Sequence, residues 1–430
     1  MRIQFNKSSQ LLLAAAASLL AAFSITACSQ FTQTLTVDFV YVLSAKAAGA
    51  NQYGEIDVFE INSESGRMRQ IPTSPFPSAG RNPVAEAVSS DYKSLFVVNQ
   101  DDNTIVQFVI GSDGKIYPFN TVNTPGIYPL AVAATKSNVF VVDTYQPLPL
   151  CSTADPCSGS IGVYPLLAGG SSGSAPCNAT VCLGAPLVNS AVNGSYWPLT
   201  LSGASSNDVV VPTAVNVTAS GSFVYVTAYD SSTPSPVGYV FSFSVASDGT
   251  LTPLSGSPFL IGAGTKPSAI ASDPTSTYVY VTDLLNAVVH GYNAASGNLT
   301  ELAGSPFRTG GQPSAVVVNP TYPFAYVANA QDATVDAYSI SNGSLTSLGS
   351  YTTGVDPVAI GIDPSTNHFL YTIDFLNNTV SNFELNMTGG TLLDAQFSPY
   401  PTAAQPVAVA AVPHNGTGAG IKAADATSGH

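Results

Sequence analysis

Charged residues are scarce in this sequence. Asp, Glu, Lys and Arg make up 9% of its 430 residues, against roughly 25% in an ordinary soluble domain. Long solvent-exposed helices draw on Glu, Lys and Arg for their polar faces, so the shortage argues against a helical protein. Basic residues are the scarcest, with 12 Lys and Arg against 26 Asp and Glu and a formal net charge of −14. No basic cluster could neutralise phosphates, which excludes nucleic acid as a partner and disfavours phosphorylated substrates and anionic lipid surfaces.

Long apolar runs are also absent beyond the N-terminal segment. Residues 1–27 have the features of a secretory signal: Arg2 and Lys7 at the start, an apolar stretch at 11–23, and small residues after it. The tetrapeptide Ile-Thr-Ala-Cys that ends at Cys28 resembles a bacterial lipobox, which implies cleavage before Cys28 and lipidation of that residue. The alternatives are an ordinary signal peptide or an uncleaved anchor, although the apolar stretch is short for a spanning helix.

The N-terminal pattern therefore predicts an exported lipoprotein on the periplasmic or extracellular face, with residues 28–35 as a tether. The Cys28 lipid would be its only membrane contact. Loss of Arg2 and Lys7 with the signal would make the net charge two units more negative.

Cysteine is rare as well, and only Cys151, Cys157, Cys177 and Cys182 remain once Cys28 is assigned to lipid. In an exported protein two disulfides are the expected use of four cysteines. We expect local pairing, Cys151 with Cys157 and Cys177 with Cys182. A zinc site is the alternative, but Cys-x-x-Cys pairs and a nearby histidine are missing.

The chain is rich in turn-forming residues, with 36 Gly and 31 Pro, and 45% of its residues are hydrophobic. This composition predicts one large all-β domain.

An internal repeat supports the all-β prediction, since the triplet Pro-x-Ala opens an apolar stretch seven times. The seven copies begin at Pro83, Pro129, Pro212, Pro267, Pro313, Pro357 and Pro406. Successive copies are mostly about 45 residues apart, the length of a four-stranded propeller blade. One longer gap of 83 residues predicts an insertion, at about residues 146–209, that contains all four disulfide candidates.

Each copy continues with the same elements. The second strands are predicted at residues 39–42, 95–98, 139–142, 223–226, 278–281, 324–327 and 369–372, and the third at 56–61, 104–110, 160–165, 239–245, 287–292, 334–340 and 379–385. A Gly- or Asn-containing turn leads to an outer strand, which in three copies closes with Ser-Pro-Phe. The chain starts on a second strand and ends on a lone first strand at residues 406–412. We therefore predict a seven-bladed β-propeller over residues 36–413, with four-stranded antiparallel blades and a C-terminal strand that joins the N-terminal blade. Residues 414–430 are predicted to be a disordered tail.

The second strands carry a family resemblance. Tyr-Val-Tyr-Val-Thr-Asp at 278–283 and Phe-Ala-Tyr-Val-Ala-Asn at 324–329 resemble the YVTN repeat of seven-bladed propellers in the lactonase family. That family includes the 6-phosphogluconolactonase-like proteins, and the resemblance covers about residues 36–413. It implies a propeller fold and, as one option for the activity, hydrolysis of a lactone. The His- and Arg-bearing segments expected of a cytoplasmic sugar-phosphate lactonase are not recognisable in this sequence, which argues for a lactone without phosphate.

Two sets of polar residues are expected on one face of such a propeller, around its axis. Directly before the Pro-x-Ala triplets stand Arg81, Asn82, Tyr128, Lys266, Gln312, Asp356 and Gln405; directly after the second strands stand Asn99, Asp143, Asp230, Asp283, Asn329 and Asp374. Such oxygens suit Ca²⁺ or another divalent cation, or a sugar or lactone. The structural alternative is that Asp and Asn only end strands and begin turns. Histidine chemistry is not expected.

Glu86 breaks the repeat, because the other six copies have Val or Ile three residues after the proline. A carboxylate on an innermost strand must be paired or have a raised pKa, which makes Glu86 a candidate general base or ligand. The alternatives are a buried pair with Arg81 or a strand end open to water. In a lactonase Glu86, Asp143, Asp283 or Asp374 would activate water, and Arg81 or Lys266 would stabilise the oxyanion.

Three functions are compatible with these features. The first is a surface-tethered module that binds a small molecule, a glycan or an envelope protein through its loop face. The second is an extracytoplasmic lactonase acting on a non-phosphorylated lactone. The third is a structural envelope component. We expect a monomer in each case, with no nucleic acid partner. No cofactor is required by these features, and Ca²⁺ or another divalent cation at the loop face is an option.

Overall fold

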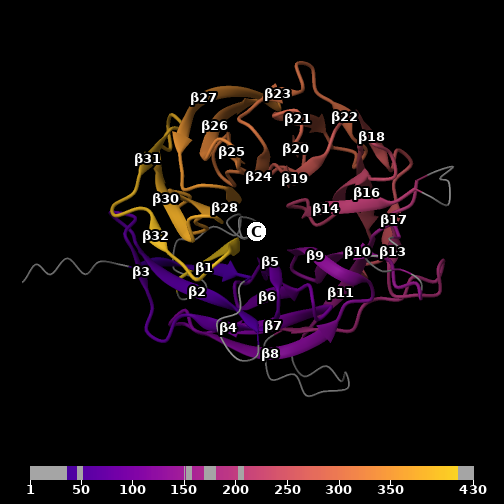
Figure 1. Cartoon of the computed structure of the whole chain (residues 1–430), viewed down its shortest axis with the longest axis horizontal. Helices are drawn as coiled ribbons and strands as arrows, with labels where there is room; N and C mark the ends of the chain where they lie inside the picture. The colour runs from indigo at the N-terminus through magenta and orange to yellow at the C-terminus, as the bar shows by residue number, and fades with distance from the viewer. Residues whose placement is uncertain are drawn as a thin grey trace, which may run out of the picture. The chain divides into compact units, whose positions relative to one another are not determined.

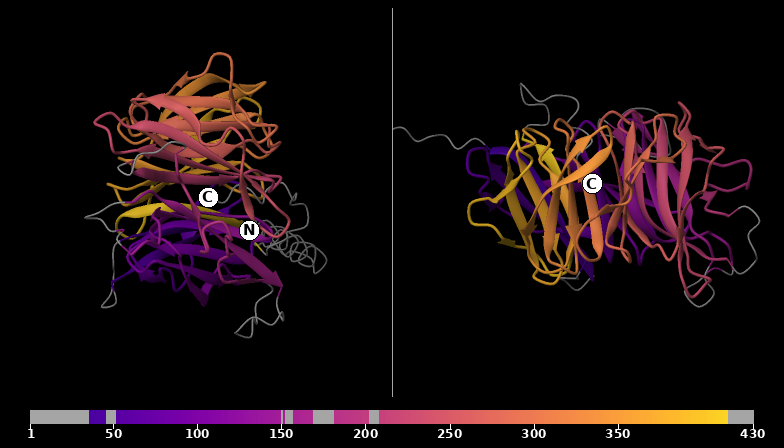
Figure 2. Two further views of the ribbon diagram at one scale, coloured as in Figure 1. Left: turned by 90° about the vertical axis from the view of Figure 1, so that its right-hand side faces the viewer. Right: turned by 90° about the horizontal axis from the view of Figure 1, so that it is seen from above.

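The computed structural model describes residues 36–45, 52–149, 151, 157–168, 181–201 and 208–414. Within these ranges every regular element is a β-strand, and the strands form seven antiparallel sheets arranged as the blades of a propeller (Figure 1). The strands run across the thickness of the ring (Figure 2). No helix in the described part of the chain is long and apolar enough to cross a membrane. The predicted all-β, seven-bladed fold is confirmed.

Each blade has four strand positions, counted outward from the axis, and the blades are numbered here by their second strands. The innermost strands of blades 2 to 7 and of blade 1 are β5 (Pro83–Val88), β9 (Ile127–Ala134), β14 (Val210–Val217), β19 (Pro267–Ser272), β24 (Pro313–Val318), β28 (Pro357–Ile362) and β33 (Pro406–Pro413). The second strands of blades 1 to 7 are β1 (Thr36–Ser44), β6 (Ser94–Asn99), β10 (Asn138–Tyr145), β15 (Phe223–Asp230), β20 (Tyr278–Asp283), β25 (Phe324–Asn329) and β29 (Phe369–Asp374).

The third and fourth positions follow the same order. The third strands of blades 1 to 7 are β2 (Tyr53–Asn62), β7 (Thr104–Ile110), β11 (Ser160–Ala168), β16 (Val237–Val245), β21 (Val288–Asn293), β26 (Thr334–Ser341) and β30 (Thr379–Leu385). The outer position is a single strand in blades 2 and 6, β8 (Ile116–Asn123) and β27 (Ser344–Thr352). It is split in the other blades into β3 (Met68–Gln70) and β4 (Phe76–Arg81), β12 (Val181–Leu183) and β13 (Trp197–Pro198), β17 (Leu251–Pro253) and β18 (Phe259–Ala263), β22 (Thr300–Glu301) and β23 (Phe307–Arg308), and β31 (Leu392–Asp394) and β32 (Tyr400–Pro401).

The ring closes as predicted. The last strand, β33, pairs antiparallel with the first, β1, with Phe39 opposite Val412 and Leu43 opposite Ala408. Blade 1 therefore combines both ends of the propeller sequence, and β33 supplies the innermost strand that this blade would otherwise lack.

The Ser-Pro pairs of the outer strands explain four of the splits. The peptide bonds Ser74-Pro75, Ser257-Pro258, Ser305-Pro306 and Ser398-Pro399 are cis. In each case the serine hydroxyl accepts a hydrogen bond from a backbone N–H of the third strand, as in Val58 N to Ser74 Oγ at 2.8 Å and Gly291 N to Ser305 Oγ at 3.0 Å. The hydroxyl thus replaces a ladder acceptor where proline interrupts the outer strand.

The long gap in the repeat contributes to blade 3. Residues of the predicted insertion form β11, β12 and β13, and Trp197 is buried against blade 4, where its Nε1 donates to Leu251 O at 2.9 Å. Cys151 and Cys157 form the predicted disulfide, with Cα atoms 5.4 Å apart. Cys182 is also disulfide-bonded. Its predicted partner Cys177, like Cys28 and the tail from residue 415, lies outside the described residues.

The core lies between the blades. Seven clusters of buried apolar side chains each combine residues of two neighbouring blades, and together they account for all seven interfaces of the ring. The two faces of most strands are therefore both covered, which explains the small number of charged residues.

A recurring contact joins the second strand of one blade to a turn of the next. In blade 5, the Tyr280 hydroxyl donates to Gly343 O of blade 6 at 2.9 Å. Gly343 has φ +82°, and a Cβ there would lie 2.5 Å from the Tyr278 ring. The same arrangement recurs for Tyr41 with Gly114, Tyr225 with Gly297, and Tyr326 with Gly390. The aromatic-x-Tyr pattern of the repeat is thus explained by packing between blades.

We expect Gly343→Ala to destabilise the protein by roughly 2–4 kcal/mol, because it adds a clash with Tyr278 to the strain of positive φ. Gly221→Ala is the matched control: Gly221 also has positive φ, +69°, but open space at the Cβ position, so a cost of only about 1 kcal/mol is expected. Tyr280→Phe removes one buried hydrogen bond and should cost about 1 kcal/mol. Urea unfolding measures all three; equal effects of the two glycine variants would contradict the packing argument.

Candidate functional site

The two predicted sets of polar residues lie at one end of the ring. In the strand registers, Pro83 lies opposite Asn99 and Pro267 opposite Asp283, so the residues before the prolines and those that end the second strands are neighbours. The same register holds in blades 3, 6 and 7. The structure therefore confirms that the loops between blades meet the loops between second and third strands.

The residue before the proline has a left-handed backbone in five blades. Asn82, Tyr128, Gln312, Asp356 and Gln405 have φ between +50° and +61°. Such a conformation is uncommon for residues other than glycine and must be held by its surroundings.

Asp283 shows how the loop is held. Its Oδ1 accepts Lys266 N at 3.0 Å and Leu285 N at 3.1 Å, and its Oδ2 accepts Asn286 Nδ2 at 2.6 Å. His290 Nε2 lies 3.8 Å from the same Oδ2. Burial raises the pKa of Asp283, but the donors of His290, Asn286 and the backbone outweigh it, so the net pKa is lowered. Asp283 is 1% exposed and acts as a positioning residue for the Lys266 loop.

Asn329 and Asp374 have the same place in blades 6 and 7, and both are fully buried. Asn329 Oδ1 accepts Thr309 Oγ1 at 2.9 Å. Asp374 accepts the hydroxyls of Thr372, Thr379 and Ser381. Asn329 thus holds the loop that leads to Gln312. Ser381, which is bound to Asp374, accepts Gly354 N at 3.3 Å in the loop that leads to Asp356.

The remaining strand-ending residues are also buried. Asp143 accepts Gly126 N at 3.0 Å, and burial raises its pKa to about 7. Asp230 accepts Val209 N at 3.3 Å and two donors of Ser232. Asn99 donates weakly to Thr104 Oγ1 at 3.4 Å. The structural alternative for this set is therefore well supported, and its role in ligand binding stays a prediction.

Two anchors were missed by the sequence interpretation. Asp57 accepts Ala403 N at 2.6 Å, and burial raises its pKa to about 6. Asp336 accepts Gly310 N at 3.0 Å and Thr309 Oγ1 at 3.0 Å. Both stand inside third strands, where no turn signal marks them, and only the packing of the loop onto the strand reveals them.

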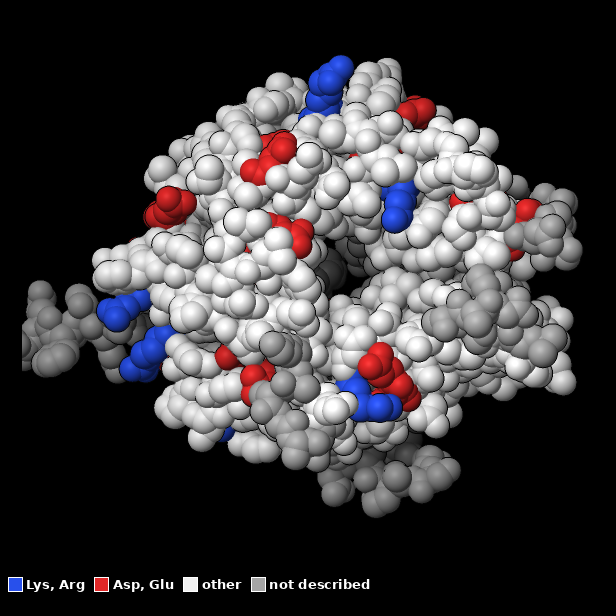
Figure 3. All heavy atoms as spheres, viewed as in Figure 1, with Lys and Arg blue, Asp and Glu red and all other residues white. Residues whose placement is uncertain are grey.

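The residues before the prolines are more exposed to solvent than the buried residues that end the second strands. Arg81 and Gln312 are exposed, and Lys266 and Asp356 are half-buried. Arg81 is bound to Asp102, with Nε 2.6 Å from Oδ1. Lys266 Nζ lies 4.9 Å from the centre of the Tyr229 ring. The face of the ring drawn in Figure 3 has a central opening and only scattered charged side chains.

Lys266, Gln312 and Asp356 precede three consecutive innermost strands, β19, β24 and β28, which contact one another in that order. The Asp356 carboxylate forms no hydrogen bond or ion pair within the described part of the chain, and burial raises its pKa. We call these three residues the mouth triad. They bring a carboxylate, an amide and an ammonium group to adjacent blades. Among the described residues no group of three or more His, Cys, Asp or Glu could hold a metal ion.

Glu86 lies in the core between blades 1 and 2. It is 3% exposed, and neither carboxyl oxygen has a hydrogen-bond partner among the described residues. Burial raises its pKa well above the ordinary value; the Ala410 N–H partly offsets this, although it is not in hydrogen-bond geometry. Both structural alternatives for Glu86 are wrong, since Arg81 binds Asp102 and the strand is closed to water.

Glu86→Gln tests this interpretation through stability. Because the folded-state pKa is raised, the native state prefers the neutral acid, and stability falls as the pH rises from about 4.3, the pKa of an unfolded-state Glu, through the native pKa. We expect the variant to match the native protein near pH 4 and to exceed it by about 1–3 kcal/mol at pH 8. Melting temperatures across this pH range measure the difference; a variant that is less stable at pH 8 would show that the carboxylate has a favourable partner.

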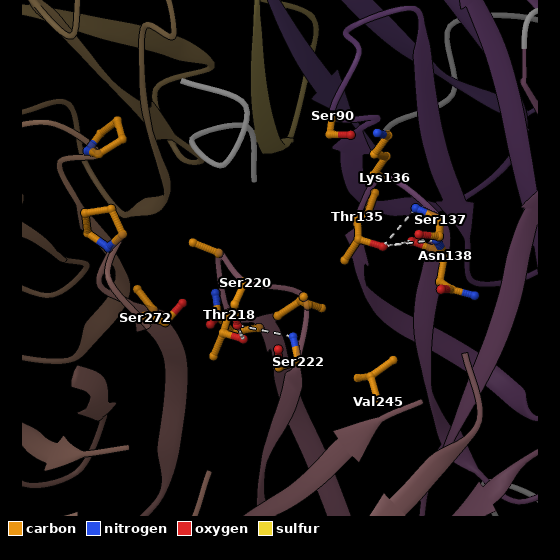
Figure 4. Close-up of a pocket in the computed structure, with 18 of the residues that line it drawn as sticks. Ser90, Thr135, Lys136, Ser137, Asn138, Thr218, Ser220, Ser222, Val245 and Ser272 are labelled. Atoms are coloured by element: carbon orange, nitrogen blue, oxygen red, sulfur yellow. Dashed lines mark hydrogen bonds between the residues drawn. The ribbon is translucent and has the colours of Figure 1, made fainter. Parts of the chain in front are cut away.

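The opposite end of the ring has a cavity of about 710 Å³. It is lined by residues that end innermost strands and begin the turns to the second strands (Figure 4). None of the predicted site residues lines it.

Solved structures with the same fold come from several bacteria. A provisionally assigned 6-phosphogluconolactonase from Bacteroides fragilis superposes with a TM-score of 0.68 and 20% identity, covering 88% of this chain and 99% of that one. The periplasmic gluconolactonase of Pseudomonas aeruginosa superposes with a TM-score of 0.65 and 15% identity, covering 87% and 99%. At these identities the likeness concerns the fold. No curated protein matches the chain.

The family is shown by a match to a family model, since the sequence identities to the solved structures are too low to show it. The model described as "Lactonase, 7-bladed beta-propeller" matches residues 188–406, about half of the chain. The chain belongs to the lactonase family of seven-bladed β-propellers.

Proposed function

We propose that the protein hydrolyses a non-phosphorylated lactone at the mouth triad. Family membership carries this proposal, and the arrangement of Lys266, Gln312 and Asp356 on adjacent blades supports it. The substrate would be bound where the innermost strands begin, at the end of the ring that also has the Cys151–Cys157 disulfide loop.

Asp356 is the proposed general base. Unlike Asp283, Asp143 and Asp374, its carboxylate is not used to hold a loop. It would accept a proton from a water molecule that attacks the lactone carbonyl carbon. When the ring C–O bond breaks, the protonated Asp356 would return the proton to the leaving oxygen, and the product is a hydroxy acid.

Lys266 is the proposed oxyanion stabiliser. Its ammonium group makes no ion pair within the described residues, and the Asp283 carboxylate holds its backbone N–H. Partial burial strengthens its interaction with the negative charge that develops on the carbonyl oxygen. Gln312 lies between the two and can bind hydroxyl groups of the substrate through its amide.

A substrate without phosphate is proposed for an electrostatic reason. The Arg81 guanidinium is already bound to Asp102, which leaves Lys266 as the only unpaired cation that the predicted site residues supply. Phosphate sites commonly combine several donors or basic groups.

The location remains part of the proposal. The predicted lipidation site Cys28 and the predicted signal segment lie outside the described residues. The gluconolactonase of P. aeruginosa, which shares the fold, is periplasmic. We propose that this chain too is exported and held by the Cys28 lipid.

The assay is acid release from glucono-1,5-lactone and from its 6-phosphate, above the spontaneous rate. We expect turnover of the first compound and little of the second. Asp356→Asn should lower kcat at least 100-fold, and Lys266→Met by roughly 10- to 100-fold. Activity should rise with pH as Asp356 ionises, with a midpoint above the ordinary Asp value because its pKa is raised.

Asp394→Asn is the matched control. Asp394 is an exposed carboxylate on β31, the outer strand of the same blade, and its loss should leave kcat unchanged. Lactone turnover that survives Asp356→Asn would disprove the assigned base. If the protein binds the lactone without turnover, the binding-module hypothesis replaces the lactonase proposal.

A further inference from the structure

The cavity at the far end of the ring collects residues from five blades. Val88, Ala134, Asn216, Ala271 and Val317 belong to the innermost strands of blades 2 to 6, and all line it. The mouth triad precedes the innermost strands, whereas the cavity lies where these strands end. The mouth triad and the cavity therefore lie at opposite ends of the ring and share no residue.

Hydroxyl groups dominate the polar lining of the cavity. Figure 4 shows one group of polar residues, Thr218, Ser220, Ser222 and Ser272, across the cavity from Ser90, Thr135, Lys136, Ser137 and Asn138. Within the described residues, the side chains of Ser90, Ser137, Ser222, Ser247 and Ser272 make no hydrogen bond to protein. Each hydroxyl can both donate and accept a hydrogen bond.

The charged groups of the lining do not favour an ion. The Asp273 carboxylate accepts the N–H groups of Thr277 and Tyr278, at 2.7 and 2.6 Å, and so caps its own turn. Asp91 Oδ1 accepts the Ser89 hydroxyl at 2.6 Å. With these two carboxylates and one ammonium group, that of Lys136, on its wall, the cavity suits a neutral ligand.

Asn216 is the residue that distinguishes this cavity from the rest of the repeat. It stands four residues after Pro212, where the other copies have Ala, Val or Gly. It is 6% exposed, and its Oδ1 has no hydrogen-bond partner among the described residues. A buried amide oxygen without a partner costs roughly 1–3 kcal/mol, so a polar group here calls for an explanation.

The strand register gives the direction of Asn216. Ala214, two residues earlier, packs in the cluster with Ile270 of β19, and alternate residues of a strand share a face. Asn216 therefore faces the junction of blades 4 and 5, the side to which Ser272, two residues after Ile270 on β19, also points. Asn216 and Ser272 both line the cavity.

We propose that this cavity binds a small neutral polyhydroxylated molecule, a monosaccharide or a cyclic polyol. Asn216 would supply an amide oxygen and N–H₂ group to adjacent ligand hydroxyls, and Ser222 and Ser272 would complete the hydrogen bonds. The side chains of Val88, Val217 and Val317 provide the apolar wall against which the C–H groups of a sugar can pack. The proposal does not depend on lactone hydrolysis.

The test uses the full mature chain and four probes: glucose, galactose, xylose and myo-inositol. Saturation-transfer NMR and titration calorimetry would measure binding. At least one probe should bind, and Asn216→Ala should weaken it at least tenfold. Asn216→Ala introduces the alanine that blades 1, 2, 3 and 5 have at this position. Its melting temperature should therefore stay equal or rise, as loss of an unpaired buried amide predicts.

Ser350→Ala, on the outer strand β27, is the control and should bind as the native protein does. Ser222→Ala provides a second variant in the lining should Asn216→Ala melt earlier, and it should also weaken binding. Asp356→Asn should retain sugar binding, which separates this proposal from the lactonase. Failure of all four probes to bind, or unchanged binding in both lining variants, would overturn the proposal.

Discussion

The contact between the second strand of one blade and the turn glycine of the next is the constraint on which the ring depends. Every backbone ladder lies within a single blade, so adjacent blades are joined by side chains and by the connecting loops. The Tyr280 hydroxyl and the Tyr278 ring close on Gly343 from two sides. A side chain at that turn would push the blades apart, and a shorter second strand would leave the interface open.

Packing between strands and loops also explains the buried polar residues at the ends of the second strands. Asp283 and Asp374 are buried and surrounded by donors, and each lies beside the loop that begins the innermost strand of its own blade. A loop with left-handed residues needs such anchors, since its own backbone hydrogen bonds are incomplete. Carboxylates of this kind are structural even though they encircle the axis. Asp356 differs because its loop is held by its neighbours, and its own side chain is left free for chemistry.

The two ends of the ring thus have different chemical characters. One end has a free carboxylate on blade 7 and a free ammonium group on blade 5, with Gln312 of blade 6 between them, and the proposed hydrolysis rests on these groups. The other end has hydroxyls, a buried amide and carboxylates that already cap turns. Glu86 belongs to neither end. It is a carboxyl group buried inside an interface, and burial, not a catalytic neighbour, raises its pKa.

The sequence by itself determined the fold, because blade length, the Pro-x-Ala triplets and the aromatic second strands recur with a period that only a closed ring of blades satisfies. It also determined the closing strand β33 and the face on which the polar residues meet, and it predicted the Cys151–Cys157 pairing that the structure has. Tertiary structure decided which of those residues are free. The sequence pattern made Asp283 a candidate general base and Asp356 a ligand-binding residue of the loop face. Burial and hydrogen-bond partners separate them, since these depend on how the loop of one blade packs against the strand of the next, over distances that no local pattern records. The Asp336 anchor and the cavity beside Asn216 arise in the same way, from residues that meet only when neighbouring strands and blades are in place.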